Sequence, residues 1–231
     1  MALYAISDLH LSLGTNKPMD IFSSQWEGHA EKLKRNWLET IKEEDTVIIP
    51  GDVSWATYLE DALEDFQFLN MLPGRKIISK GNHDYWWTTI AKMNRFLEEN
   101  RFLNLFFLHN NYFEYEDWII CGTRGWSYCD KGAGEEDEKI FNREQKRLEF
   151  SLEQGEKAGR DRIITVLHYP PFSYNNNDSG FIKIMKDYNV SICVYGHLHG
   201  DFSLARQGII NGIEFKFVSS DYLDFKPCRL M

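Results

Sequence analysis

Aspartate, asparagine and histidine side chains recur along this chain directly after short apolar runs. The side chains that follow five such runs are Asp8 and His10, Asp52, Asn82, His168, and His197 and His199. Each alone is more typical of a structural hydrogen bond at a strand end. Together they are hard to explain by packing, because buried carboxylates and imidazoles are costly unless something neutralises them. The joint pattern therefore predicts bound divalent metal ions.

The number and type of these donors indicate the kind of centre. Two carboxylates, one amide and four imidazoles are too many for one tetrahedral ion. They suit two ions bridged by one carboxylate, with water in the open positions. Oxygen and imidazole donors without thiolate favour Mn, Fe or Zn over Ca. We therefore expect two divalent metal ions as cofactors.

The densest group of polar side chains is the stretch Gly81-Asn82-His83-Asp84, which follows the apolar pair Ile77-Ile78. Gly81 allows the backbone to turn sharply, so that the next three side chains can point into a common space. Folding alone does not call for an amide, an imidazole and a carboxylate side by side after a buried strand. This stretch is the expected chemical focus of the chain.

The elements that position these residues follow from the apolar periodicity. The expected strands are 3–6, 46–49, 76–78, 105–108, 112–116, 118–121, 163–167 and 192–195, with hairpin-like turns at 110–111 and 116–117 and a final hairpin over 208–219. The expected helices are 25–44, 58–72, 86–99 and 135–157. This order predicts an α/β fold with mixed sheets covered by helices. In such sheets the ligand site lies beyond the carboxyl ends of the strands.

The motif set resembles that of the calcineurin-like metallophosphoesterases. The matching motifs are Asp8-x-His10, Gly51-Asp52, Gly81-Asn82-His83-Asp84, His168 and Gly196-His197-x-His199. The resemblance implies a four-layer α/β/β/α sandwich of two mixed β-sheets flanked by helices. It also implies one domain over residues 1–231, a dinuclear centre at the strand ends, and hydrolysis of phosphoric esters by a metal-bridged hydroxide.

Roles for individual residues come from the same resemblance. One ion would take Asp8, His10, Asp52 and His199. The other would take Asp52, Asn82, His168 and His197. His83 would bind no metal but would face the phosphoryl group and protonate the leaving alkoxide, oriented by Asp84.

Several aromatic and basic residues outside the motif set border these motifs. Tyr85, Trp86 and Trp87 suit either an aromatic wall for a base or aryl group, or core anchors of the following helix. Arg124, in a glycine-flanked loop with Trp126, suits either a phosphate clamp or a surface ion pair with the acidic run 135–138. Tyr85, Trp86, Arg124 and Trp126 are thus the candidate substrate contacts.

Two further segments and two further histidines also give rise to predictions. Residues 122–157 form a candidate lid whose acidic helix is expected to present a solvated face. Residues 11–24 form a long loop that could border the site. His29 and His109 are expected to be a helix-surface residue and a strand-turn residue without function.

The amino-acid composition indicates which binding partners and which cellular location to expect. Of 231 residues, 43% are hydrophobic and 26% charged, as in an ordinary globular protein, and the formal net charge is −9. That charge disfavours a nucleic-acid partner. We expect no signal peptide, no membrane span, a reduced cytoplasmic setting and no obligate protein partner. The expected partner is a small phosphorylated or nucleotide-like substrate.

Three alternatives remain open. The same centre could serve a phosphoprotein phosphatase or a nuclease. The fold could also be a scaffold without catalysis, but such relatives would be expected to lose His83 or several metal ligands. This chain keeps all of them.

Overall fold

Two mixed β-sheets face each other in the computed structural model, which describes residues 1–127, 134–172 and 179–231. The first sheet has the strand order β11 (Cys228–Arg229), β1 (Leu3–Ala5), β2 (Thr46–Ile49), β3 (Arg75–Ile78) and β4 (Leu105–Phe107). The second has the order β5 (Tyr112–Tyr115), β6 (Trp118–Gly122), β7 (Arg162–Val166), β8 (Ile192–Tyr195), β10 (Ile213–Phe217) and β9 (Gly208–Ile210). β1 to β4 pair in parallel, as do β6, β7, β8 and β10.

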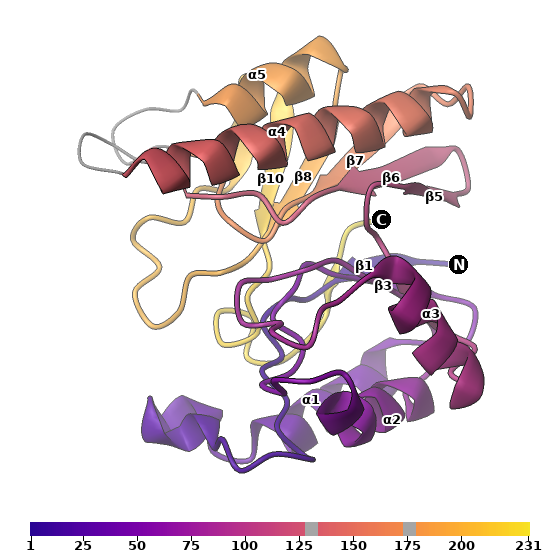
Figure 1. Ribbon diagram of the computed structural model, residues 1–231, viewed down its shortest axis with the longest axis vertical. Helices are drawn as coiled ribbons and strands as arrows, with labels where there is room; N and C mark the ends of the chain where they lie inside the picture. Colours follow the sequence, from indigo (N-terminus) through magenta and orange to yellow (C-terminus); the bar gives the residue numbers. More distant parts are fainter. Residues whose placement is uncertain (128–133, 173–178) are drawn as a thin grey trace.

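Helices cover the outer face of each sheet (Figure 1). Below the first sheet lie α1 (His29–Thr40), α2 (Leu63–Met71) and α3 (Ile90–Glu99). Above the second lie α4 (Glu135–Glu156) and α5 (Gly180–Asp187). Short 3-10 helices, η1 (Met19–Ile21), η2 (Ser24–Trp26) and η3 (Glu60–Ala62), occupy the connections. The four-layer α/β/β/α sandwich expected from the sequence is confirmed.

Three apolar cores fill the spaces between these four layers. Successive side chains of a strand point to opposite faces, so Val47 and Ile49 of β2 join the core under α1 to α3, while Ile48 joins the core between the sheets. In the second sheet, Ile163 packs toward α4 and α5, and Ile164 packs toward the first sheet. Strands buried on both faces read as continuous apolar runs, which is why the sequence revealed them.

Lys76 on β3 breaks this pattern, because its side chain is fully buried and its ammonium group donates to the carbonyl of Leu72. Burial lowers the pKa of Lys76 to about 7. The unfolded chain, with an ordinary lysine pKa, binds more protons than the folded chain between pH 7 and 10.5, so stability should rise with pH across that window.

We expect Lys76→Met to be more stable than the wild type at pH 7, by about 1–3 kcal/mol, because it buries no charge. The variant should also lose most of the gain in stability between pH 7 and 10. Urea unfolding across this range measures both effects. Lys216→Met, a partly exposed lysine on β10, should retain the wild-type slope. A slope unchanged in Lys76→Met would contradict the assignment.

Some expected boundaries and pairings were wrong. α1 begins at His29 instead of 25, and α3 begins at Ile90 instead of 86, where the side chain of Thr89 caps the amide of Lys92. The expected hairpin at 110–111 does not form, because β4 pairs in parallel with β3 while β5 pairs with β6 in the other sheet. The chain crosses between the sheets at this point. The hairpin at Asn211-Gly212 is confirmed, whereas α5 was not anticipated.

The helix of the candidate lid is a layer of the fold. Leu148 and Leu152 of α4 are buried, and a Cβ on Gly155 would lie 2.7 Å from the sulfur of Cys121 on β6. α4 therefore lies directly on the second sheet. Its acidic first turn is exposed as expected, but Glu144 is buried. Residues 128–133 of the candidate lid lie outside the described residues.

Candidate metal centre

Four of the expected metal ligands have a left-handed backbone. The φ angles are 59° at Asp8, 45° at His10, 52° at Asp52 and 77° at His197. For residues other than glycine this conformation costs about 1–3 kcal/mol each and persists where the surroundings enforce it. Here the loops after β1 and β2 run side by side, with the amides of Asp8 and His10 donating to the carbonyls of Gly51 and Asp52. The strand ends thus turn abruptly and aim their side chains into one space.

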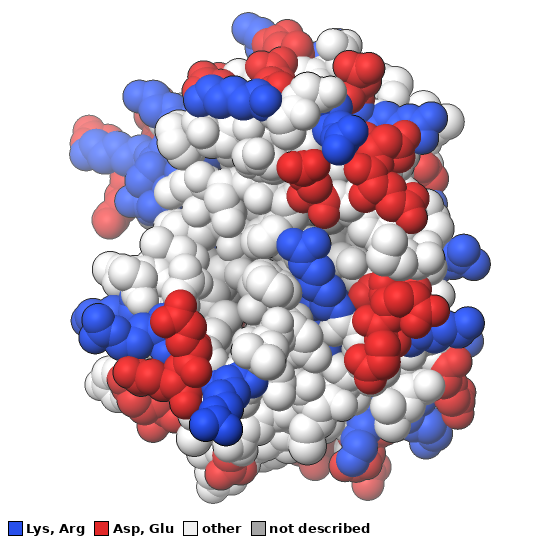
Figure 2. Space-filling view, turned by 90° about the vertical axis from the view of Figure 1, so that its right-hand side faces the viewer, with Lys and Arg blue, Asp and Glu red and all other residues white. Residues whose placement is uncertain are grey.

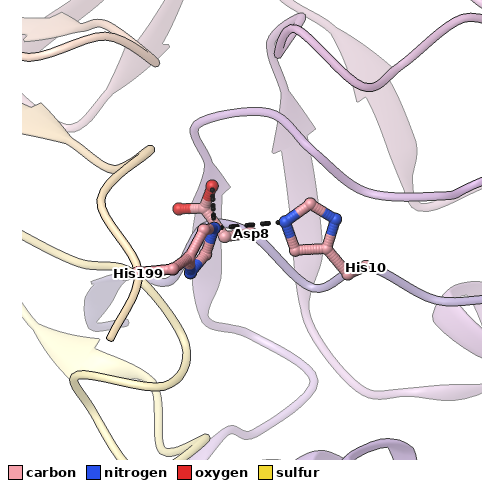
Figure 3. Close-up of side chains that lie close together, drawn as sticks. All are labelled: Asp8, His10 and His199. Atoms are coloured by element: carbon pink, nitrogen blue, oxygen red, sulfur yellow. Dashed lines mark hydrogen bonds and ion pairs between the residues drawn. The ribbon is translucent and has the colours of Figure 1, made fainter. Parts of the chain in front are cut away.

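A first group of ligand atoms gathers around His199 (Figure 3). His199 Nε2 lies 3.4 Å from Asp8 Oδ1 and 3.2 Å from His10 Nε2. His10 Nε2 in turn lies 3.8 Å from Asp52 Oδ2. These are the four residues expected at the first ion.

A second group gathers around His168. Its Nε2 lies 2.6 Å from Asn82 Oδ1 and 3.4 Å from Asp52 Oδ2. His197 Nδ1 lies 2.9 Å from the same Asn82 oxygen. These four residues match the expected second set, and Asp52 Oδ2 belongs to both groups. Asp8 Oδ1 also lies 3.9 Å from His168 Nδ1, so both carboxylates lie near both groups and the bridging role of Asp52 stays a prediction.

The donor chemistry fits divalent cations at both groups. His168 Nδ1 donates to the carbonyl of Pro50, 2.9 Å away, so Nε2 carries a lone pair and faces the Asp52 carboxylate. His199 Nδ1 lies 3.0 Å from Asp221 Oδ1, and its Nε2 faces the Asp8 carboxylate, so in the neutral ring that a cation would favour, Nε2 would carry the lone pair. Pairs of acceptors aimed at each other are stabilised by a cation between them, and imidazole with carboxylate suits Mn, Fe or Zn.

Without bound ions, the pKa values of these groups are shifted in both directions. Burial lowers the pKa of His168 to about 3 and that of His197 to about 4, so both imidazoles are neutral ligands at pH 7. Burial, together with the carboxylates of Asp84 and Asp8, raises the pKa of Asp52. Burial opposes protonation of His199, but Asp8 and Asp221 raise its pKa to about 10. Bound divalent ions would reverse the local field and favour the ionised carboxylates and neutral imidazoles.

One oxygen of Asp8 is held in place so that the other points into the centre. Asp8 Oδ2 accepts hydrogen bonds from the hydroxyls of Ser7 and Ser219 and from the amide of His197, the last at 3.0 Å. A Cβ on Gly196 would lie 2.3 Å from this oxygen, so only glycine allows β8 to approach so closely. Asp8 Oδ1 remains directed at His199.

Asp221 supports the first group and was missed in the sequence. Its side chain is buried, and it bonds to His199 Nδ1 and accepts from the amide of Gly200 at 3.1 Å. A carboxylate on the far nitrogen of a metal-binding histidine fixes the ring and increases its basicity. The available signal was Ser219-Ser220-Asp221, a polar run separated from the end of β10 by Val218.

Asp221→Asn should weaken metal binding by about 10–100-fold, because the His199 ring loses its carboxylate partner. Since His199 belongs to the first group only, one ion should be affected far more than the other. Calorimetric metal titration of the apoprotein measures this. The exposed Asp161→Asn is the matched control. Equal weakening of both ions would contradict a role confined to His199.

The expected role of Asp84 as the residue that orients His83 was wrong. Its carboxylate accepts from the amides of Gly81, Asp52 and Val53 at 2.7, 2.9 and 2.9 Å. It also accepts from the indole of Trp86 at 3.0 Å. The fully buried carboxylate therefore fastens the loop after β2 to the loop after β3, which positions two metal-ligand segments instead of the His83 ring.

His83 lies beside the metal ligands without joining them. Its amide donates to Asp52 Oδ1 at 2.7 Å, and its ring centre lies 4.5 Å from that of Trp55. Its Nδ1 is 3.5 Å from the hydroxyl of Tyr85. Burial, followed by the charge of His199, lowers the pKa of His83. The ring is held between two aromatic side chains and faces the site.

Aromatic side chains line the surroundings of the centre, but Trp86 is not among them. It is 1% exposed and packs in the core under the first sheet, so the expectation of a substrate contact there was wrong. Tyr85 is 58% exposed at the surface beside His83. Sequence reasoning missed Trp55, which stacks on His10 at 5.0 Å, and Tyr169, whose ring lies 4.2 Å from His197.

Arg124 and Trp126 lie beside the second group. The Arg124 guanidinium stacks on Trp126 at 4.6 Å, and the Trp126 ring lies 5.1 Å from Tyr169. Arg124 pairs with the buried Glu144 at 3.8 Å instead of with 135–138. The carbonyl of Arg124 also accepts from the amide of His168. A phosphate clamp by Arg124 stays a prediction.

His29 was expected on the helix surface, but it is buried. Its two ring nitrogens lie 3.1 Å from the carbonyl of Trp26 and 3.3 Å from that of His10. It therefore supports the backbone of a metal ligand. His109 lies outside the centre, with its ring 5.8 Å from Trp87.

A two-sheet α/β sandwich with groups of candidate metal ligands at the strand ends is typical of metal-dependent hydrolases. A family model described as calcineurin-like phosphoesterase matches residues 1–201. The chain belongs to this family.

Solved structures with the same fold differ widely in sequence. A protein of unknown function from Aquifex aeolicus is 21% identical, with a TM-score of 0.52 over 99% of this chain and 95% of that chain. A phosphopantetheinyl hydrolase from Mycobacterium tuberculosis is 17% identical, with a TM-score of 0.58 over 100% of this chain and 95% of that one. A protein from Thermus thermophilus is 14% identical, with a TM-score of 0.58 over 92% and 86%. The search of curated proteins found no match.

A helix that crosses a bilayer must be both long and apolar. Within residues 1–127, 134–172 and 179–231, no helix is both long and apolar enough to do so.

Proposed function

We propose that this protein hydrolyses the phosphoric ester of a small phosphorylated or nucleotide-like molecule. The observation that carries the proposal is the position of Asp52, whose Oδ2 lies 3.8 Å from His10 Nε2 and 3.4 Å from His168 Nε2 while its Oδ1 accepts from the amide of His83. One residue thus links both expected ions to the candidate general acid. Family membership supports metal-dependent phosphoester chemistry.

The residues around the centre have separate roles in the proposed hydrolysis. Two divalent ions held by the two groups would lower the pKa of a water between them to near neutrality and withdraw charge from the phosphoryl oxygens. His83 would donate a proton to the departing alkoxide. The rings of Trp55 and Tyr85 flank its imidazole. Asp84 holds the two loops that carry Asp52 and Asn82 in register.

The finer assignments belong to the same proposal. Mn, Fe or Zn are the ions that the donor set favours. The substrate is proposed to be small, with no protein partner required, and the setting to be cytoplasmic. The phosphopantetheinyl hydrolase among the similar folds suggests adding a phosphopantetheine ester to the substrates tested.

A nuclease or phosphoprotein phosphatase remains the second candidate. Figure 2 shows the face on the right-hand side of Figure 1, where acidic and basic side chains lie in small mixed groups. No continuous basic stripe crosses the residues drawn there, and the formal net charge is −9. Polynucleotide binding relies on such basic surfaces. These features favour a small substrate, and the retained His83 favours an enzyme over a scaffold.

The test is a screen with Mn-loaded protein. p-Nitrophenyl phosphate, bis(p-nitrophenyl) phosphate, cyclic nucleotides, nucleotides, phosphopeptides, short nucleic acids and a phosphopantetheine ester serve as substrates. Hydrolysis of a small ester that disappears on chelation and returns with metal supports the proposal. Turnover unaffected by chelation would refute the mechanism, and a clear preference for nucleic acid or phosphopeptide would favour the second candidate.

A further inference from the structure

A cavity of about 740 Å³ opens beside Tyr85, away from the metal ligands. Residues 57–60, which follow the loop that carries Asp52, form one wall. Lys92, Arg95, Phe96 and Glu99 of α3 form the other. Tyr58 and Tyr85 are exposed, at 68% and 58%, although both are large aromatic residues. A space of this size can hold a drug-sized organic group.

Two cations and two carboxylates line this cavity. Lys92 and Arg95 of α3 line it, and both are exposed. No ion pair within 4.0 Å joins either of them to a carboxylate in the part of the chain that the structure describes. Glu60 and Glu99 also line the cavity; Glu99 lies about 10 Å along the helix from Lys92 and about 6 Å from Arg95. Because neither cation is held in an ion pair, both can contact an anion.

The cavity adjoins the site on the side of the candidate general acid. Tyr85 lines the cavity, and its hydroxyl lies 3.5 Å from His83 Nδ1. A group that protonates a leaving oxygen must lie within hydrogen-bond reach of it. Whatever is attached to that oxygen therefore begins next to Tyr85, at the mouth of the cavity.

We infer that this cavity binds the leaving group of the substrate, and that this leaving group carries a second anionic group recognised by Lys92 and Arg95. The inference rests on the proposed function and narrows its substrate class to esters with a second phosphate or equivalent anion. Tyr58 and Tyr85 pack against the organic chain between the two anions. The first phosphate occupies the metal centre.

The test compares alkanediol bisphosphates of increasing chain length with alkyl monophosphates of the same length, using Mn-loaded protein. For at least one of the chain lengths, kcat/KM should be about tenfold higher for the bisphosphate than for the monophosphate. Tenfold is the effect of one charge-assisted contact. Arg95→Gln should abolish most of this ratio. Arg35→Gln, another exposed helical arginine, on α1, should retain it.

A binding measurement separates the inference from the proposed function. Calorimetry with the corresponding bisphosphonates and monophosphonates, which are not hydrolysed, should show the same preference and the same loss in Arg95→Gln. If binding discriminates but no ester is hydrolysed, the proposed function fails together with the leaving-group role, and only the recognition of a second anion by Lys92 and Arg95 stands. If both esters are hydrolysed equally at every length, or if Arg95→Gln and Arg35→Gln behave alike, the inference is overturned.

Discussion

Asp52→Asn is expected to release both metal ions together and to reduce turnover by at least about 100-fold. Asp52 Oδ2 lies 3.8 Å from His10 Nε2 in one ligand group and 3.4 Å from His168 Nε2 in the other. An amide in its place removes the negative charge that both ions share, a larger change than loss of an outer-shell partner, which already costs about 10–100-fold. Metal content after dialysis and steady-state rates measure the effect.

Two further variants serve as controls for this result. Asp45→Asn removes another buried carboxylate, one that accepts from the amides of Ala2 and Lys42 far from the centre, and should retain both ions. His10→Ala should weaken mainly one ion. If Asp52→Asn lost a single ion and kept the other at wild-type affinity, the carboxylate would not be the bridge.

His83→Ala is expected to retain both ions and to lose about 10²–10⁴-fold in turnover, the usual contribution of a positioned proton donor. The imidazole lies outside both groups of candidate ligands, and the hydrogen bond to Asp52 comes from the backbone amide, which alanine retains. The loss should be smaller for p-nitrophenyl phosphate than for an alkyl ester, because p-nitrophenolate leaves readily without a proton. Rates on both substrates, with metal content, measure this.

His109→Ala is the matched control, since it is a partly buried histidine outside the centre. Its rates and metal content should equal those of the wild type. A His83→Ala protein with full turnover on the alkyl ester would exclude His83 as the proton donor. A loss of metal would instead show that the ring supports the ligand groups.

The strands and the candidate metal ligands could be identified in the sequence for a shared reason. β2, β7 and β8 are buried on both faces, so each appears as an apolar run. The ligands follow those runs directly, because the carboxyl ends of parallel strands meet at one edge. Local patterns were therefore sufficient to identify both the elements and the candidate centre.

Contacts between distant segments were not predictable in this way. Asp84 binds amides about thirty residues earlier in the chain, so proximity in sequence wrongly suggested His83 as its partner. Asp221 and Trp55 approach His199 and His10 only through the tertiary fold. The turn at Asn110 was visible, with a φ of 57°, but a turn signal does not reveal that the next strand joins the other sheet.

The two ligand groups draw their members from both sheets, and this has a consequence for folding as well as catalysis. Asp8 follows β1 of the first sheet, whereas His168 and His197 follow β7 and β8 of the second. Ions held between them would act as a reversible cross-link that closes a loop over most of the chain. Such closure removes entropy from the unfolded state, as a disulfide does. Metal affinity and the free energy of unfolding are then linked quantities, so the concentration of free metal would set how firmly the two sheets are joined.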